Sequence, residues 1–190
     1  MISAWAERIT EMLCDAGSID ENDKELYKYG FFILLSRIIF FVLAVAVGMV
    51  FRIPGESIMF FIMFSLLRSY AGGIHAKKEW VCTVLTSLMI LFSVAVLWFL
   101  RTRETVLIPL LMLLSGLVPV LVFSPVDSQG KPLSAEDGRH YRLLSWLVSI
   151  GYVILAAAGV VLKFYAVLYC AALAVFLEGS MLLYGKIAGK

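Results

Sequence analysis

Long apolar runs separated by short polar connectors constrain this chain more than any other feature of its sequence. Residues 31–51 and 80–100 each form a run of 21 residues, and two more runs of similar length cover 143–162 and 164–184. At 1.5 Å per residue, such a run is long enough to cross a bilayer as a helix. The chain is 62% hydrophobic, whereas soluble domains are about 45–50% apolar. The sequence therefore predicts a helical integral membrane protein.

Two further apolar segments are less regular. Residues 57–67 number only 11, so this segment either completes a crossing with its flanking residues or is re-entrant. Residues 105–123 are long enough to span, and their prolines and glycine predict a bend. We expect an all-α polytopic bundle of about six spans, the second of them short or distorted. Residues 1–190 then form one membrane domain, with a cytoplasmic region at 1–29 and the bundle at 30–185.

The N-terminal segment has the period of an amphipathic helix over residues 2–13. Its apolar side chains share one face, and its charged side chains, two of them acidic, lie opposite. Surface-lying membrane helices are usually rich in Lys and Arg. This helix is therefore expected to pack on its own protein, to hold a peptide substrate, or to lie at the interface with no substrate role. Asp20 is expected to cap the helix that leads into the first span.

The lysines and arginines of the connectors predict the orientation of the chain. With six spans and a cytoplasmic N-terminus, the inner segments carry eleven of these residues and the outer connectors carry four. Both termini are then cytoplasmic, and so are His75, Cys82 and Lys131. The formal net charge of +2 and the absence of a basic block give no indication of nucleic-acid binding.

Cysteines and histidines are few and scattered. The three cysteines, Cys14, Cys82 and Cys170, are too far apart in the sequence to suggest a disulfide framework. Together with two histidines they do not form a zinc ligand set, so we expect no metal and no cofactor. Cys170 lies in an apolar run, where a neutral thiol is inert. His140 is most simply a solvated interface residue and is kept as an alternative to His75.

The residues that could carry out catalysis lie in the stretch between residues 65 and 82. Cys82 can supply a thiolate nucleophile, and His75 an imidazole that takes and returns a proton. Seven residues along one straight helix would separate them by about 10.5 Å, so a working dyad requires a break between them. Gly72 and Gly73 supply backbone freedom just before His75. Cys82 would then lie in the first turn of the next helix, where the helix dipole favours a thiolate. The alternative is a plain cytoplasmic loop followed by a structural cysteine.

Two motifs together resemble one known family. The first is R-S-Y-A-G-G-I-H-A-x5-C, from Arg68 to Cys82, and the second is P-V-D-S-Q-G-K-P-L, from Pro125 to Leu133. Their order, and the size and number of spans, resemble the accessory gene regulator B family of bacterial membrane peptidases. The resemblance covers nearly the whole chain.

This resemblance implies a cysteine endopeptidase that trims the precursor of a cyclic autoinducing peptide in the cell membrane. In some members a residue of the peptide resolves the acyl-enzyme to give a thiolactone. The resemblance also implies a homodimer as an expectation. Cys82 and His75 would be catalytic, and the matching motif positions would bind substrate or support the site; these are Arg68, Gly72, Gly73, Asp127 and Lys131.

Two other classes of function compete with this one. The chain is alternatively a small peptide exporter that uses Arg37 and Glu178 along a pathway, or a membrane scaffold without catalysis. These two side chains are the ionisable groups set deepest in the apolar runs, each about 9 Å inside the same leaflet. Because an unpaired charge in a bilayer is costly, we expect them to contact each other. Otherwise Arg37 snorkels to the interface and Glu178 is protonated.

The charge count yields a topology that labelling can test. We expect single cysteines at positions 77 and 131 to react with an impermeant maleimide only when the reagent reaches the cytoplasmic side. Labelling of either position from outside intact cells would overturn the predicted orientation.

Overall fold

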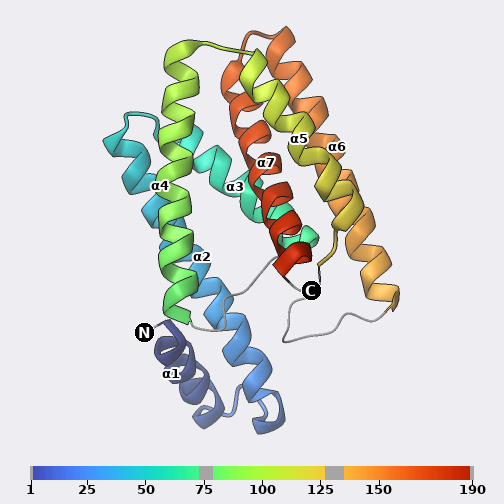
Figure 1. The fold of residues 1–190 in the computed structure, drawn as a ribbon. Helices are drawn as coiled ribbons and strands as arrows, with labels where there is room; N and C mark the ends of the chain where they lie inside the picture. Colours follow the sequence, from blue (N-terminus) through green and yellow to red (C-terminus); the bar gives the residue numbers. More distant parts are fainter. Residues whose placement is uncertain (1, 73–78, 127–134, 189–190) are drawn as a thin grey trace. The chain divides into compact units, whose positions relative to one another are not determined.

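Helices make up nearly all of the regular structure in the computed structural model, which describes residues 2–72, 79–126 and 135–188. Seven α-helices and one 3-10 helix occur in these ranges (Figure 1). In chain order they are α1 (Ile2–Asp15), η1 (Glu21–Asp23), α2 (Lys24–Val50), α3 (Pro54–Ala71), α4 (Glu79–Arg103), α5 (Leu107–Phe123), α6 (Ala135–Val161) and α7 (Tyr165–Ala188). The predicted all-α class is therefore confirmed.

Four helices in the described ranges are long and apolar enough to cross a membrane. They are α2, α4, α6 and α7. Helix α5 is apolar but has only 17 residues, and the 18-residue α3 is not among the four. The membrane character of the chain is thus supported, whereas the predicted count of six spans is not confirmed.

Several helices extend beyond the apolar runs that predicted them, and α3 and α6 are two examples. Helix α3 starts at Pro54, which occupies the first turn where its missing N–H costs nothing, and continues past residue 67 to Ala71. Helix α6 starts at Ala135, eight residues before the apolar run 143–162 that predicted it. Hydropathy marks where apolar side chains stop, whereas a helix can continue through polar residues that suit it. The polar stretch between the apolar runs 105–123 and 143–162 therefore contains the first turns of α6.

The chain consists of two compact units, Met1–Leu43 and Ala44–Lys190. In the first unit the predicted amphipathic helix is confirmed as α1, and its acidic side faces lysines of α2. Lys28 Nζ lies 2.9 Å from Glu7 Oε1, and Lys24 Nζ lies 3.7 Å from Glu11 Oε1. The hydrogen bond from Lys28 holds the pKa of the Glu7 carboxyl below its ordinary value.

The turn between α1 and α2 has the cap that the sequence predicts. Asp20 precedes η1 in an extended conformation, and its side chain accepts a hydrogen bond from the Asn22 backbone N–H. This bond satisfies one of the donors that every helix start leaves open. On the other side of α1, Trp5 and Met12 are each about two-thirds exposed.

The second unit is organised around α7. Residues 168–175 are all buried, so this part of the helix has no exposed face. Helices α3, α4, α5 and α6 all contact α7, which Figure 1 shows between α4 and α5. A helix buried all round is the core of its bundle, and the other helices of this unit take their positions from it.

The closest approach in this unit is a glycine contact between α5 and α7. A Cβ atom built on Gly179 would collide with the backbone of Gly116, and one built on Gly116 would lie 2.5 Å from Cα of Phe176. Small residues allow membrane helices to pack backbone to backbone, where dispersion contacts replace the hydrophobic drive that lipid does not supply. Pro119, buried one turn after Gly116, lies inside the same helix.

Any side chain at position 116 must force α5 and α7 apart. We expect Gly116→Ala to lower the free energy of unfolding by about 1–3 kcal/mol, the usual cost of overpacking. Gly151→Ala is the matched control, because a Cβ at Gly151 in α6 meets nothing within 4 Å. Thermal unfolding of both variants in detergent tests this, and equal melting temperatures would contradict the role of the glycine contact.

Candidate active site

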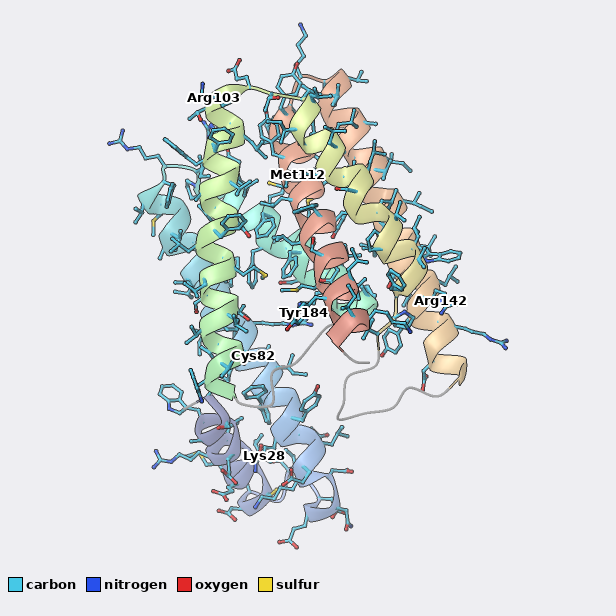
Figure 2. The ribbon with its side chains drawn as sticks, in the orientation of Figure 1. Lys28, Cys82, Arg103, Met112, Arg142 and Tyr184 are labelled. Atoms are coloured by element: carbon cyan, nitrogen blue, oxygen red, sulfur yellow. The ribbon has the colours of Figure 1, made fainter. Side chains whose placement is uncertain are left out.

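Cys82 lies in the first turn of α4, which begins at Glu79. The helix-start position predicted for this cysteine is thus confirmed. Its side chain is partly exposed, as reactive cysteines usually are. Figure 2 shows Cys82 at the end of α4 opposite Arg103. The first four backbone N–H groups of a helix have no acceptor within it, so donors that can stabilise an oxyanion lie near the thiol.

The other two cysteines have different surroundings. Cys170 is fully buried in α7, and its Sγ donates a hydrogen bond of 3.3 Å to the carbonyl oxygen of Glu56. Cys14 is partly exposed near the end of α1, in the unit that does not contain α4. Exposure distinguishes Cys82 from Cys170, while position at a helix start distinguishes it from Cys14.

The two sequence motifs meet at the end of α3. Val126 N donates a hydrogen bond of 3.1 Å to the carbonyl oxygen of Ala71, and Gly72 and Val126 form a parallel β-bridge. Gly72 has φ 81° and ψ −167°, a conformation that is essentially restricted to glycine. An added Cβ there would also collide with the Val126 carbonyl oxygen. Both loops could be singled out from the sequence, but no sequence feature indicates that they contact each other.

Helix α6 also contacts the chain at the start of the second motif. Arg142 Nε donates to the carbonyl oxygen of Ser124 at 3.1 Å, and the Tyr141 ring lies 6.5 Å from the ring of Tyr70 in α3. The chain therefore enters the second motif between two fixed helices. The exposed His140 precedes this pair in α6 and has its ring 6.4 Å from that of Tyr141.

Arg68 points from the last turn of α3 towards α7. Its Nη1 lies 2.7 Å from the Met181 sulfur and 4.0 Å from Glu178 Oε2, and its guanidinium lies over the ring of Phe64. Glu178 is fully buried. From the sequence we identified Glu178 as an ionisable residue deep in an apolar run and expected Arg37 to be its partner. That pair spans the two units and stays a prediction, whereas Arg68 is the ionic neighbour observed for Glu178.

Four predicted site residues lie outside the described residues: His75, Gly73, Asp127 and Lys131. The separation of His75 from Cys82, and the roles of Asp127 and Lys131, therefore stay predictions. Across residues 2–72, 79–126 and 135–188, no group of three or more His, Cys, Asp and Glu side chains is arranged to hold a metal ion.

Comparisons with known proteins place these motifs in a family. The model of the family described as "Accessory gene regulator B" matches residues 6–182. An AgrB-like protein of Clostridium perfringens strain SM101 is 30% identical over 141 residues, which cover 72% of this chain and 66% of that protein. An AgrB-like protein of Listeria monocytogenes strain EGD-e is 25% identical over 161 residues, covering 84% and 77% respectively.

The alignment thus spans just under two thirds of the length of the Clostridium relative. No solved structure matches the chain. Because the family match extends over nearly all of the sequence and contains both motifs, this chain belongs to the accessory gene regulator B family.

Proposed function

We propose that this protein is a membrane-embedded cysteine endopeptidase that processes the precursor of a quorum-sensing peptide at the cytoplasmic face. Family membership associates the chain with the accessory gene regulator system. The observation that carries the enzymatic part is the position of Cys82, partly exposed in the first turn of α4. In the proposed arrangement α3 and α5 cross the membrane in addition to α2, α4, α6 and α7, which gives six crossings. Both termini are then cytoplasmic.

The proposed reaction begins when the Cys82 thiolate attacks the scissile carbonyl carbon. His75 holds the thiol proton, and backbone N–H groups at the start of α4 stabilise the oxyanion. The tetrahedral intermediate then expels the amine, which takes the proton from His75, and a thioester to Cys82 remains. Water hydrolyses this thioester, or a Cys or Ser side chain of the peptide attacks it to give a thiolactone or lactone and release the free thiol.

The contact between the two motif loops supports a shared site. Gly72 precedes His75 by three residues, and Val126 precedes Asp127 by one. Because Gly72 and Val126 are bridged, residues of both motifs leave the bundle from one point. We propose that Asp127 and Lys131 bind the peptide there, and that Gly72 and Gly73 allow the turn that brings His75 to Cys82.

Removing the nucleophile or the base tests the reaction. We expect Cys82→Ser and His75→Ala each to lower cleavage at least about 100-fold, the range of general-base and nucleophile effects. Cleavage is measured by mass spectrometry after co-expression with candidate precursors from neighbouring reading frames. Such a peptide has an amphipathic N-terminal part, a central Cys or Ser and an acidic tail.

Cys14→Ala and Cys170→Ala are the matched controls and are expected to cleave at the wild-type rate. Unchanged processing by a membrane-inserted Cys82→Ala variant would instead favour an exporter or a scaffold. Faster alkylation of Cys170 than of Cys82 near neutral pH would show that the nucleophile is wrongly assigned.

The bridge between the motif loops generates a separate prediction. Gly72→Ala places a Cβ against the Val126 carbonyl oxygen in a conformation that costs about 1–3 kcal/mol for other residues. We expect this variant to cleave at least about tenfold more slowly, since roughly 1.4 kcal/mol of misplacement energy corresponds to tenfold in rate. Gly55→Ala, at the other end of α3, meets nothing within 4 Å and is the control. Equal rates for the two variants would show that the bridge has no role in the site.

A further inference from the structure

Helix α1 packs on α2 through its charged side. Glu7 and Glu11 form ion pairs with Lys28 and Lys24 of α2. Ala6, which precedes Glu7 in the chain, is fully buried. A surface helix usually turns its apolar side inwards and its charged side towards solvent. In α1 a charged side faces the neighbouring helix instead, so its apolar side is left without a partner in this unit.

The apolar side of α1 is consequently exposed. Trp5, Ile9 and Met12 lie on one side of the helix, because they are spaced four and three residues apart. The side chains of Trp5 and Met12 are 67% and 68% exposed, and that of Ile9 is partly exposed. We call these three residues the outer strip of α1. Contiguous apolar surface that remains exposed in a folded protein marks a site where a partner binds.

The register of α1 against α2 shows how far the outer strip extends from the membrane. In the two ion pairs, the later residue of α1 pairs with the earlier residue of α2, so the helices are antiparallel (Figure 1). The same register puts Trp5 level with position 30 and Met12 level with position 23, and the apolar run of α2 starts at Phe31. At 1.5 Å per residue, Met12 then lies about 12 Å outside the hydrocarbon core, beyond a headgroup layer about 5–7 Å thick. Lipid can therefore cover Trp5 but not Met12.

The charge of this helical hairpin indicates which kind of partner fits the outer strip. Residues 1–30 contain seven Asp and Glu residues but only three Lys and Arg residues. All seven acidic residues are exposed, whereas both lysines that face α1 are partly buried. Such a surface repels anionic lipid headgroups and attracts a cationic peptide. The partner is thus expected to combine an apolar side with positive charge.

We infer that the outer strip of α1 binds a basic amphipathic helix. The apolar side of that helix covers Trp5, Ile9 and Met12, and its lysines or arginines face the surrounding carboxylates. Amphipathic helices bind partners in this way through apolar residues spaced three and four apart. Under the proposed function, the bound helix is the amphipathic N-terminal part of the precursor. Only this identification rests on the proposed function, since the docking surface does not involve Cys82.

Binding is measured with the full chain carrying Cys82→Ala, in phosphatidylcholine nanodiscs. The probe is a fluorescent synthetic helix with leucines on one side and lysines on the other, and a second peptide has glutamates in place of the lysines. Fluorescence anisotropy gives Kd after binding to empty nanodiscs is subtracted. The test variant combines Ile9→Gln with Met12→Gln. Leu26→Gln is the matched control, because Leu26 is an apolar residue of α2 that is 63% exposed and lies outside the strip.

We expect the double variant to bind the lysine peptide at least about tenfold more weakly than the parent, the usual effect of removing central apolar contacts. Leu26→Gln is expected to bind it with the parent affinity. The glutamate peptide is expected to bind the parent at least about tenfold more weakly than the lysine peptide, and added salt to reduce this difference. With the precursor and an intact Cys82, the double variant is expected to raise KM and leave kcat unchanged.

Equal affinity of the parent and the double variant for the lysine peptide would overturn the docking surface. Equal binding of the two peptides would overturn its preference for positive charge. An unchanged KM would show that the helix bound here does not belong to the precursor. If the lysine peptide binds as expected but the wild-type chain does not cleave the precursor, the proposed function fails and the docking surface stands.

A fluorescent label on Met12→Cys, in a chain without its other cysteines, tests the other possible occupants of the outer strip. We expect this label to be unaffected by brominated lipid chains and to become shielded from a soluble quencher when the lysine peptide is added. Quenching by the brominated lipid without peptide would show that the bilayer covers the strip. Energy transfer between labelled copies without peptide would show that a second copy covers it. Either result would overturn the inference.

Discussion

The close contact between α5 and α7 is the constraint on which the larger unit depends. Gly116 and Gly179 bring two backbones together without intervening side chains. In lipid, such packing supplies the dispersion contacts that water-driven burial supplies elsewhere. The buried stretch of α7 before this contact also contains Ala171, Ala172 and Ala174, so neighbouring helices can approach it closely. This makes α7 a fixed reference for the helices around it.

Helix α3 is held by α7 at both ends and by α6 in the middle. Near its start, the Glu56 carbonyl oxygen accepts from Cys170 Sγ, and near its end Arg68 faces Glu178. Between them, the Tyr152 hydroxyl of α6 donates to the Met63 carbonyl oxygen at 2.7 Å. A helix fixed at three levels by two neighbours has little freedom to slide. The glycine at its C-terminus can therefore present the following segment from a defined place.

Local sequence patterns predicted those parts of the structure that local physics decides. Apolar runs predicted the long helices, the 3.6-residue period predicted α1, and Asp20 was expected at the cap where its side chain is found. Cys82 was expected in the first turn of a helix because an apolar run begins beside it. Each of these features depends on residues within a few positions of one another.

Contacts between distant segments could not be predicted in the same way. The bridge from Gly72 to Val126 joins residues 54 positions apart, and neither residue type indicates a partner. The sequence shows that Glu178 lies deep in its apolar run. This depth does not indicate which neighbouring helix the side chain faces. Arg68 directly follows the short apolar run 57–67, and the sequence left open how far a helix continues there, whereas α3 continues to Ala71. The ionic neighbour of Glu178 is therefore a residue just beyond that run.

The arrangement of the candidate site follows from where helix α3 ends and helix α4 begins. Gly72 ends α3 in a conformation that other residues avoid, and the carbonyl of Val126 occupies the space of a side chain. Glu79 starts α4 seven residues later, with Cys82 in its first turn. His75 thus belongs to a short segment whose two ends are held by packed helices. Since a dyad on one straight helix would be too far apart, the proposed dyad of His75 and Cys82 requires the interruption between α3 and α4.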